Sequence, residues 1–286
     1  MRNIQDIKNR KKAITETAQI TRAMELISVA KLNKLNTLLE ANREYFNAVR
    51  GAVKDIVRKS RISHPYFADS LPKKSAYIVI ASDKGLSGDY NRNILRFADG
   101  HIPDDGKGLL IPIGNEAAEF FSKRSILMEN SFLNIGGYPK LNDARKLTAV
   151  LEDDFSHGII DGVDIFYTDR KGGLPYPCHI RLLPISIKDF SAGTEEKSGY
   201  DFHYHPNMEE VLNLLVPQYL LGVVFSALIQ SAAAEHFERI RTMHSATQNA
   251  EELMEKLNLK YNKLRQEAIT TELAELSSMN TLGSKD

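Results

Sequence analysis

The sequence has almost no cysteine and no net charge. Cys178 is the single thiol in 286 residues, so no internal disulfide can form and a reducing compartment is the default expectation. Lysine and arginine total 37, and so do aspartate and glutamate. This balance gives no reason to expect nucleic acid or an anionic membrane as a partner. A hydrophobic share of 42% excludes the disordered and collagen-like classes.

The zero net charge hides an uneven distribution. Residues 1–62 carry 14 basic and 6 acidic residues, residues 63–207 carry 16 and 20, and residues 208–286 carry 7 and 11. A basic amphipathic helix can be a nucleic-acid arm, a membrane-surface helix or one strand of a coiled coil. The basic segment has few aromatic side chains, Tyr45 and Phe46, which argues against nucleic acid.

Glycine and proline are nearly absent from the N-terminal part of the chain. Between residues 3 and 62 there is one glycine, Gly51, and no proline, while apolar residues recur at steps near three and four. The pattern predicts one helix of roughly 80–90 Å with a single buried stripe. The predicted stripe consists of Ile20, Met24, Ile27, Lys31, Leu35, Leu38, Asn42, Tyr45, Val49, Ala52 and Ile56.

The C-terminal part is equally poor in helix breakers. Only Pro217 and Gly222 occur between residues 208 and 276. Steps of three and four alternate without a slip from Ile240 to Ala268, which is typical of a coiled coil. We expect this helix to pack antiparallel to the first. Its predicted seam consists of Ile240, Met243, Thr247, Ala250, Met254, Leu257, Tyr261, Leu264 and Ala268.

One uncharged segment, residues 211–234, is long enough to span a bilayer. Asn213, Pro217, Gln218 and Gln230 interrupt it and no basic residues flank it, so we interpret it as a helix buried within the fold, with membrane contact as the alternative. The first dozen residues are charged and give no sign of an export signal.

The middle of the chain alternates short apolar runs with helical patterns. Strands are predicted at residues 75–82, 106–113, 163–170 and 178–186, and helices near 91–98, 115–124 and 142–155. This alternation favours an α/β Rossmann-like domain with a parallel sheet, inserted between long N- and C-terminal helices that form an antiparallel coiled coil. The predicted parts are residues 1–62, 63–207 and 208–286.

The loop SDKGLSGDYN follows the first predicted strand, where a phosphate loop would lie. It lacks the glycine spacing of the nucleotide-binding motifs, and Ser87 is not in a nucleophile elbow. Asp83 and Asp89 could hold a metal or act as acid and base, but turn and capping roles are the commoner use.

Two histidines, His203 and His205, stand two residues apart but lack the companions of a zinc site. Cys178 begins an apolar run and is expected to be buried and inert. We therefore predict no catalytic residue, no metal site and no cofactor.

Four separated blocks resemble the gamma subunit of F-type ATP synthases. They are IKNRKKAITETAQITRAMELISVAKL near the start, ASDKGLSGDYN after the first strand, YDFHYHPNMEEVLNLLVPQYL, and ERIRTMHSATQNAEELMEKLNLKYNKLRQEAITTEL. Their order matches the family, and together they cover nearly the whole chain. Any one of them alone would be a weak signal.

The resemblance implies a rotor shaft. In that family the terminal helices enter a hexamer of alternating alpha and beta subunits, and the α/β domain lies near the epsilon subunit and the membrane-embedded c-ring. Ion flow turns the ring and the shaft, which drives the beta subunits through their nucleotide states. The resemblance thus implies a non-catalytic, peripheral subunit on the cytoplasmic face of a bacterial inner membrane.

Residue roles come from the same resemblance. Met24 and Arg239 are similar to a pair that faces the lower lever of the beta subunit. A second set is similar to the polar contacts with the beta subunit's catch loop, and a third to the side that faces the c-ring and epsilon. The second set is Arg265, Gln266, Thr270 and Glu272; the third is Tyr200, Tyr204 and His205. Without the family, an exposed i,i+4 partner would be the simpler interpretation of Arg239 and Arg265.

The chain also departs from the family pattern. His205 stands where an acid is common, Ser87 replaces a cysteine, and Asp89 replaces a glycine. The end, SSMNTLGSKD, is polar where the family has small apolar residues. These departures keep a second hypothesis open, a gamma-like subunit of a divergent or sodium-coupled rotary ATPase. A third is a nucleotide-binding Rossmann-like enzyme with a coiled-coil arm.

Overall fold

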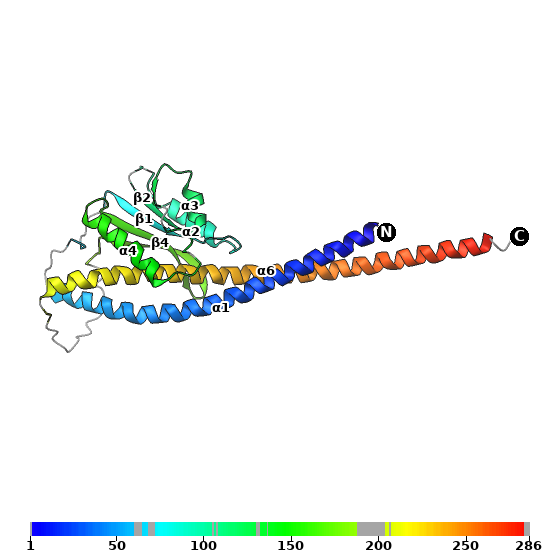
Figure 1. The fold of residues 1–286 in the computed structure, drawn as a ribbon, viewed down its shortest axis with the longest axis horizontal. Helices are drawn as coiled ribbons and strands as arrows, with labels where there is room; N and C mark the ends of the chain where they lie inside the picture. Colours follow the sequence, from blue (N-terminus) through cyan, green and yellow to red (C-terminus); the bar gives the residue numbers. More distant parts are fainter. Residues whose placement is uncertain are drawn as a thin grey trace. The chain divides into compact units, whose positions relative to one another are not determined.

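A computed structural model describes residues 2–59, 65–67, 72–104, 106, 108–129, 132–135, 137–187, 204–205 and 207–282. Contacts divide the chain into a smaller unit, Met1–Ser28 with Ile240–Asp286, and a larger unit, Val29–Arg239. Two long helices, α1 (Arg2–Lys59) and α6 (Met208–Leu282), each contribute to both units (Figure 1). The two predicted terminal helices are therefore present, and α6 runs six residues past the predicted end at residue 276.

The larger unit is built on a five-stranded sheet with the order β3-β2-β1-β4-β5. Strands β1 (Ser75–Ile80), β2 (Leu109–Ile113), β3 (Leu127–Met128) and β4 (Gly162–Lys171) pair in parallel. The runs predicted as strands form β1, β2, β4 and β5, whereas the two-residue strand β3 was not predicted.

The sheet is parallel as predicted except at one edge. Strand β5 (Leu174–Leu183) runs antiparallel to β4, because only Gly172 and Gly173 connect them. Both glycines have positive φ, 60° and 86°, as the tight turn of a two-residue hairpin requires. A connection this short cannot return the chain to the other end of the sheet, so the strands must be antiparallel.

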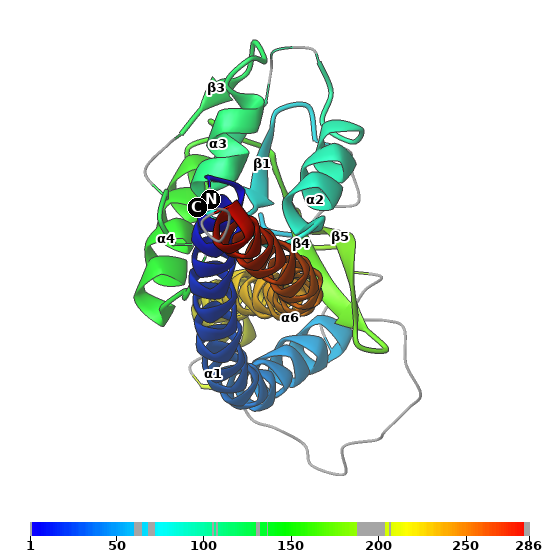
Figure 2. The same cartoon turned by 90° about the vertical axis from the view of Figure 1, so that its right-hand side faces the viewer.

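Helices cover both faces of the sheet. On one face, α2 (Tyr90–Asp99) and α3 (Asn115–Phe121) bury a cluster around Val79, Ile94 and Phe121. On the other, α4 (Leu141–Ser156) packs in one cluster with α1 and α6 (Figures 1 and 2). The long helices thus form part of a layer of the larger unit. This architecture confirms the predicted α/β domain with long terminal helices.

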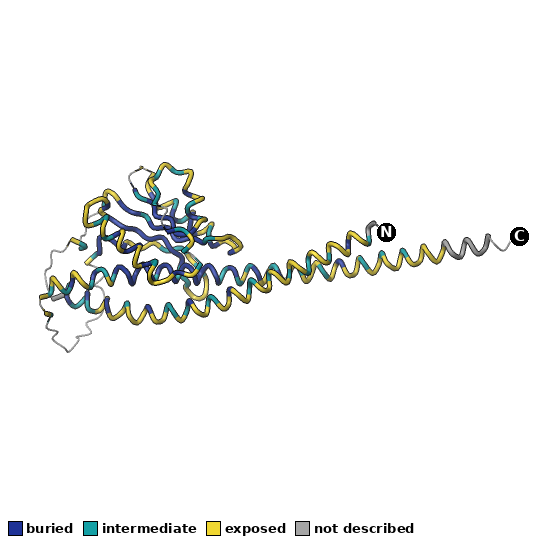
Figure 3. The backbone as a smooth tube through the Cα atoms, in the orientation of Figure 1, coloured by how far each residue is buried: buried dark blue, intermediate teal, exposed yellow. Residues whose placement is uncertain are grey.

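The uncharged segment of α6 is buried within the fold. Leu212, Val216, Leu220, Val224 and Leu228 are all buried, and Figure 3 shows this stretch of α6 as mostly buried. By length and hydropathy alone α6 could cross a bilayer, but core helices of soluble proteins pass the same test. Its burial against α1 and the sheet agrees with the interpretation as a core helix.

Helices α1 and α6 meet closely within the larger unit. Phe46 lies against Gly222, where an added Cβ would come within 2.7 Å of its ring, and it stacks on Tyr219 with centroids 5.5 Å apart. Asn42, placed in the predicted stripe, is buried and donates from Nδ2 to the Gly222 carbonyl at 3.4 Å. The buried Asn42 amide thereby finds its hydrogen-bond partner in the backbone of α6.

The predicted stripe of α1 was partly wrong. Leu35, Val49 and Ile56 are buried, but Ile20 is 61% exposed, Ile27 57% and Tyr45 48%. The observed stripe alternates steps of three and four along the whole helix. In its first half many of its residues are polar or small. It comprises Ile4, Ile7, Lys11, Ile14, Ala18, Thr21, Glu25, Ser28, Leu32, Leu35, Leu39, Asn42, Phe46, Val49, Val53 and Ile56. An assignment based on hydrophobicity selects the outward-facing isoleucines instead.

In the smaller unit, α1 and α6 form an antiparallel pair with a partly polar seam. Thr21 and Thr247 share a hydrogen bond between hydroxyls at 2.8 Å, and Thr15 donates to the Met254 sulfur at 2.9 Å. Every predicted seam position of α6 from Ile240 to Ala268 is buried or half-buried. The coiled-coil register of α6 is therefore confirmed.

Candidate functional site

Helix α6 places three polar side chains in the interior of the larger unit. Glu235, His236 and Arg239 are 3%, 3% and 8% exposed. Arg239 Nη2 donates to Glu235 Oε1 at 2.6 Å, and Nη1 lies 3.3 Å from His236 Nδ1. We call these three residues the α6 clasp. Arg239 does have the i,i+4 partner considered from the sequence, but the pair is buried instead of exposed.

The clasp joins α6 to two loops of the α/β domain. Arg239 Nη2 also reaches the carbonyls of Lys84 and Gly85, at 3.2 and 3.3 Å, in the loop that follows β1. His236 Nε2 lies 3.0 Å from the carbonyl of Gly137, in the segment between β3 and α4. The Gly137 amide in turn donates to Asp83 Oδ2 at 3.2 Å. A continuous network therefore links the helix to both loops.

Burial controls the protonation of the clasp. Desolvation raises the pKa of Glu235 above its ordinary value, although Arg239 opposes that shift. Desolvation lowers the pKa of His236 to about 4, so its imidazole is neutral at pH 7. A neutral ring that donates from Nε2 to the Gly137 carbonyl can accept a hydrogen bond from Arg239 at Nδ1, which fits the observed contacts.

The clasp lies where a Rossmann-like domain would bind a ligand. Strand β1 pairs with β2 on one side and β4 on the other, so the strand order reverses there, and ligands usually bind beyond the carboxyl ends of such strands. Here the carbonyls of Lys84 and Gly85 are engaged by Arg239 instead. Asp89, which precedes α2, pairs with Arg92 at 2.7 Å and would repel a phosphate.

The structure shows the surroundings of three other candidate residues from the sequence, Asp83, Ser87 and Cys178. The Asp83 carboxylate accepts a hydrogen bond from the Gly137 amide, 54 residues away, and so joins two loops, a different role from the local turn or cap that we favoured for it. Ser87 is buried at 2% exposure. Cys178 lies within β5 and is half-buried, not fully buried as expected, and desolvation raises its pKa. A thiol with a raised pKa is a poor nucleophile at neutral pH.

The described part of the chain contains no group of three or more His, Cys, Asp or Glu that could hold a metal ion. His205 is exposed, while His203 lies outside the described residues, as does Tyr200. Tyr204 is half-buried and packs at the edge of the cluster that α1, α4 and α6 share with the sheet. Of the third predicted site set, the structure therefore describes Tyr204 and His205 but not Tyr200.

The second site set lies together on exposed turns of α6 in the smaller unit. Arg265, Gln266, Thr270 and Glu272 are all exposed, and the Thr270 hydroxyl donates to the Gln266 carbonyl at 2.9 Å. Lys11 of α1 lies over the ring of Tyr261. Because the two helices are antiparallel, the start of α1, nine residues before Lys11, lies opposite the turn of α6 near residue 270. Beyond that point α6 extends past the start of α1, with Leu273 62% exposed.

Met24 and Arg239, predicted as a pair, have different surroundings. Met24 is half-buried on α1 in the smaller unit, and its carbonyl accepts a hydrogen bond from the Ser28 hydroxyl. The guanidinium of Arg239 is held by the clasp in the larger unit. On the surface of α1 near Met24 stand Leu26 and Ile27, which are 64% and 57% exposed.

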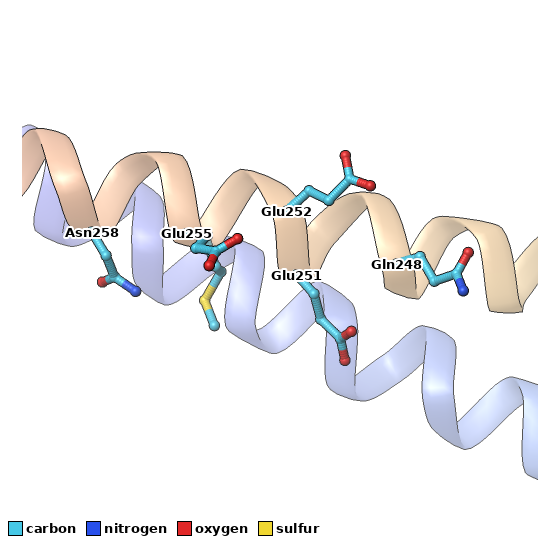
Figure 4. Close-up of a pocket in the computed structure, with 6 residues that line it drawn as sticks. Gln248, Glu251, Glu252, Glu255 and Asn258 are labelled. Atoms are coloured by element: carbon cyan, nitrogen blue, oxygen red, sulfur yellow. The ribbon is translucent and has the colours of Figure 1, made fainter.

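A groove of about 570 Å³ runs along α6 in the smaller unit. Figure 4 shows Glu251 and Glu252 on one turn and Glu255 on the next, with Gln248 and Asn258 at the ends. Arg22 of α1 approaches Glu251 at 4.0 Å. This open, acidic lining has the character of an interaction surface, because an active site normally encloses its substrate.

Known proteins match this chain over nearly its whole length. A family model described as ATP synthase matches residues 3–280. The ATP synthase gamma chain, sodium ion specific, of Acetobacterium woodii is 36% identical over 291 residues, covering 96% of each chain. The ATP synthase gamma chain of Alkaliphilus metalliredigens is also 36% identical, over 279 residues and 96% of each chain. This chain belongs to the ATP synthase gamma family.

Chains in solved structures of more distant ATP synthases share the fold. A chain in the structure of OSCP, F1 and c-ring from Euglena gracilis mitochondrial ATP synthase gives a TM-score of 0.65 at 18% identity, covering 99% of this chain and 96% of that one. The central stalk and c-ring structure from Tetrahymena thermophila gives 0.60 at 22% identity, covering 79% and 99%. The combination of long helices and α/β domain is thus a fold that known central stalks share.

Sequence reasoning missed the clasp. Glu235 directly follows the uncharged segment, and Arg239 follows four residues later, a spacing that pairs on a helix. This Glu–Arg pair was the signal that could have revealed the clasp, because it stands at the end of an uncharged segment that was itself interpreted as buried. The two loop partners lie 99 to 155 residues away in sequence and offer backbone carbonyls, which leave no mark in side-chain patterns.

Proposed function

We propose that this chain is the central-stalk rotor subunit of an F-type ATP synthase. In this role it transmits torque from an ion-driven c-ring to a catalytic hexamer of alpha and beta subunits and couples ion flow to ATP synthesis. Its partners are the alpha, beta and epsilon subunits and the c-ring. The observation that carries the proposal is a family match extending over both long helices and the domain between them.

The exposed parts of α1 and α6 support a role inside partners. Ile20, Leu26 and Ile27 of α1 and Leu259 and Leu273 of α6 expose more than half of their surface. The last turns of α6 extend beyond α1 and so lack its support. Apolar residues gathered on an exposed helix surface can mark the place where a partner binds, such as a surrounding hexamer.

The chain itself carries no catalytic step in this proposal. The ligand position beyond β1 is taken by Arg239, and the groove on α6 is open and acidic. Gamma chains belong to a membrane-associated complex, and we place this one at the cytoplasmic face of a bacterial inner membrane. Contact with the membrane then occurs only through the complex.

Residue roles follow the family where the structure leaves the side chain accessible. Arg265, Gln266, Thr270 and Glu272 are exposed on α6 and are proposed to meet the beta subunit's catch loop. The planar guanidinium of Arg265 suits a carboxylate there. Met24, with its exposed apolar neighbours, is proposed to face the beta lever, and Tyr204 and His205 the c-ring side.

Reconstitution tests the proposal. The chain is mixed with alpha, beta and epsilon subunits, joined to a c-ring sector in liposomes, and ATP-driven ion uptake is measured. Ion uptake should require this chain. ATP hydrolysis by the purified chain alone, or failure of the wild-type chain to enter the hexamer, would refute the proposal.

A sodium-coupled rotary ATPase is a second candidate. It is favoured by the Acetobacterium woodii relative, whose name specifies sodium, although another relative of equal identity carries no such term. ATP synthesis in the source membranes under an imposed sodium gradient, with protons clamped by an uncoupler, distinguishes the two. Synthesis that persists supports sodium coupling, and synthesis that stops supports protons.

A further inference from the structure

The last turn of α6 before the clasp packs in the core through small side chains only. The residues just before the clasp, Ser231 through Ala234, are fully buried and small. Small side chains let the helix approach the sheet closely, but they form few ridges that would lock its rotation. At this turn of the helix, directional contacts therefore add what the small side chains do not provide.

The clasp supplies directional contacts at this point. The Arg239 guanidinium contacts Glu235, His236 and two loop carbonyls, and all of these partners lie in the larger unit. One turn of α6 earlier, the Ser231 hydroxyl accepts from the Thr168 amide of β4 at 3.1 Å. Rolling α6 about its axis would break the hydrogen bonds to Lys84, Gly85 and Thr168 together, since those groups belong to the sheet and its loops. Glu235 and His236 lie on α6 and would turn with Arg239.

The clasp also lies at the end of the larger unit. The next residue, Ile240, begins the smaller unit, and α6 continues through this point as one helix. Arg239 is thus the last residue of α6 that belongs to the larger unit.

We propose that the α6 clasp fixes the rotation of α6 against the sheet and transmits torque from the α/β domain into the shaft. Arg239 is then a positioning residue that acts through α6. It makes its functional contacts inside this chain, unlike the hexamer contact that family resemblance implies. This inference rests on the proposed rotor function.

The test measures torsional stiffness in the complete complex. Alpha–beta hexamers are fixed to a surface, and a probe is attached through a cysteine introduced at Lys146, an exposed residue of α4, in a Cys178→Ser background. Angular fluctuations of the probe report stiffness between the domain and the hexamer. Ion uptake per ATP hydrolysed is measured in liposomes with the same variants.

Arg239→Met should lower torsional stiffness at least twofold and ion uptake per ATP at least twofold, with hydrolysis within twofold of the parent. Arg239→Lys keeps the charge but loses the planar fork, so its stiffness and its ion uptake per ATP should lie between those of the parent and of Arg239→Met. Glu235→Gln keeps the side-chain volume and should give a smaller loss in the same direction, which provides a second test if Arg239→Met fails to assemble.

Two controls separate transmission from folding. Arg96→Met removes an exposed arginine of α2, and Leu151→Ala leaves a cavity in the core of the domain outside the clasp. Both should keep the parent's stiffness, even though Leu151→Ala lowers the melting temperature. Parental stiffness in Arg239→Met, or an equal loss in Leu151→Ala, would overturn the proposal. If even the parent chain fails to couple, the proposed function itself has failed.

Discussion

At the scale of single residues, Gly222 marks a close approach of α1 and α6. An added Cβ would lie 2.7 Å from the Phe46 ring, which is itself stacked on Tyr219. We expect Gly222→Ala to lower the free energy of unfolding by about 1–3 kcal/mol through overpacking. Gly51→Ala is the matched control, because nothing lies within 4 Å of its added Cβ.

Gly51→Ala should stabilise the protein by about 0.5–1 kcal/mol through helix propensity. Urea unfolding of both full-length variants measures the difference. If Gly222→Ala were as stable as Gly51→Ala, Phe46 would have room to move and the helix contact would be looser than described.

His236 makes stability depend on pH. Its pKa is about 4 in the folded chain because of burial, and about 6.5 when unfolded. Below pH 6.5 the unfolded state gains a proton that the folded state does not, so stability is lost as the pH falls from 6.5 toward 4. At pH 5 the loss from this one group is about 2 kcal/mol.

His236→Gln should remove that dependence and still offer an amide donor to the Gly137 carbonyl. The difference in unfolding free energy between pH 7.5 and pH 5 should therefore be about 2 kcal/mol smaller in the variant. Glu235, whose pKa is raised mainly by burial, contributes to both proteins. An equal pH dependence in the two proteins would mean that the imidazole is not held neutral by the fold.

At the scale of elements, the α6 seam in the smaller unit is the simplest one to test. Leu257 is 8% exposed in the seam, and Leu259 two residues on is 70% exposed. Leu257→Asp puts an unpaired charge between the helices and should cost at least about 2 kcal/mol. Leu259→Asp should change stability by less than about 0.5 kcal/mol.

Circular dichroism melting of the full-length chain compares the two variants. Leu257→Asp should lose helical signal at a lower temperature, and Leu259→Asp should follow the parent. Identical curves for both variants would show that the seam register is wrong.

The exposed turns of α6 allow function to be separated from folding. Arg265→Ala combined with Gln266→Ala should leave the melting curve unchanged, because both side chains are exposed. In the assembled complex the same variant should lower the yield of ATP per ion transported. Unchanged ATP synthesis would remove these residues from the proposed catch-loop contact.

The elements also show how far the sequence alone could lead. The α6 seam was predicted position by position because its apolar residues repeat strictly, and β1, β2, β4, α2 and α4 were predicted from their alternating patterns. The α1 stripe failed in its first half, because Thr21, Glu25 and Ser28 face inward while isoleucines face out. A helix that also binds partners keeps apolar residues on more than one face, so hydrophobicity alone cannot identify the internal seam.

The antiparallel direction of β5 was open to prediction and was missed. Gly172 and Gly173 between two apolar runs are a hairpin signal in the sequence itself. The clasp is different, because it depends on loop carbonyls brought close by the sheet order. The exposed catch-loop set was located on α6 from sequence, and the exposure of Arg265 and Gln266 follows from the α6 seam, because both lie between its positions Leu264 and Ala268.

At the scale of the whole molecule, an α/β domain is joined to two long helices that have different roles along their length. In the larger unit the helices are core elements, covered by the sheet, α4 and each other. In the smaller unit they form a two-helix pair with exposed apolar and charged faces. A chain built this way can be gripped by one set of partners through its domain and by another through its helices.

Rotation of a single complex tests this account most directly. An alpha–beta hexamer containing this chain is fixed to a surface, a probe is attached to the α/β domain, and ATP is added. The account predicts that the probe turns in one direction and stops when ATP is exhausted. Hydrolysis of ATP by the hexamer while the probe on this chain stays still would contradict it.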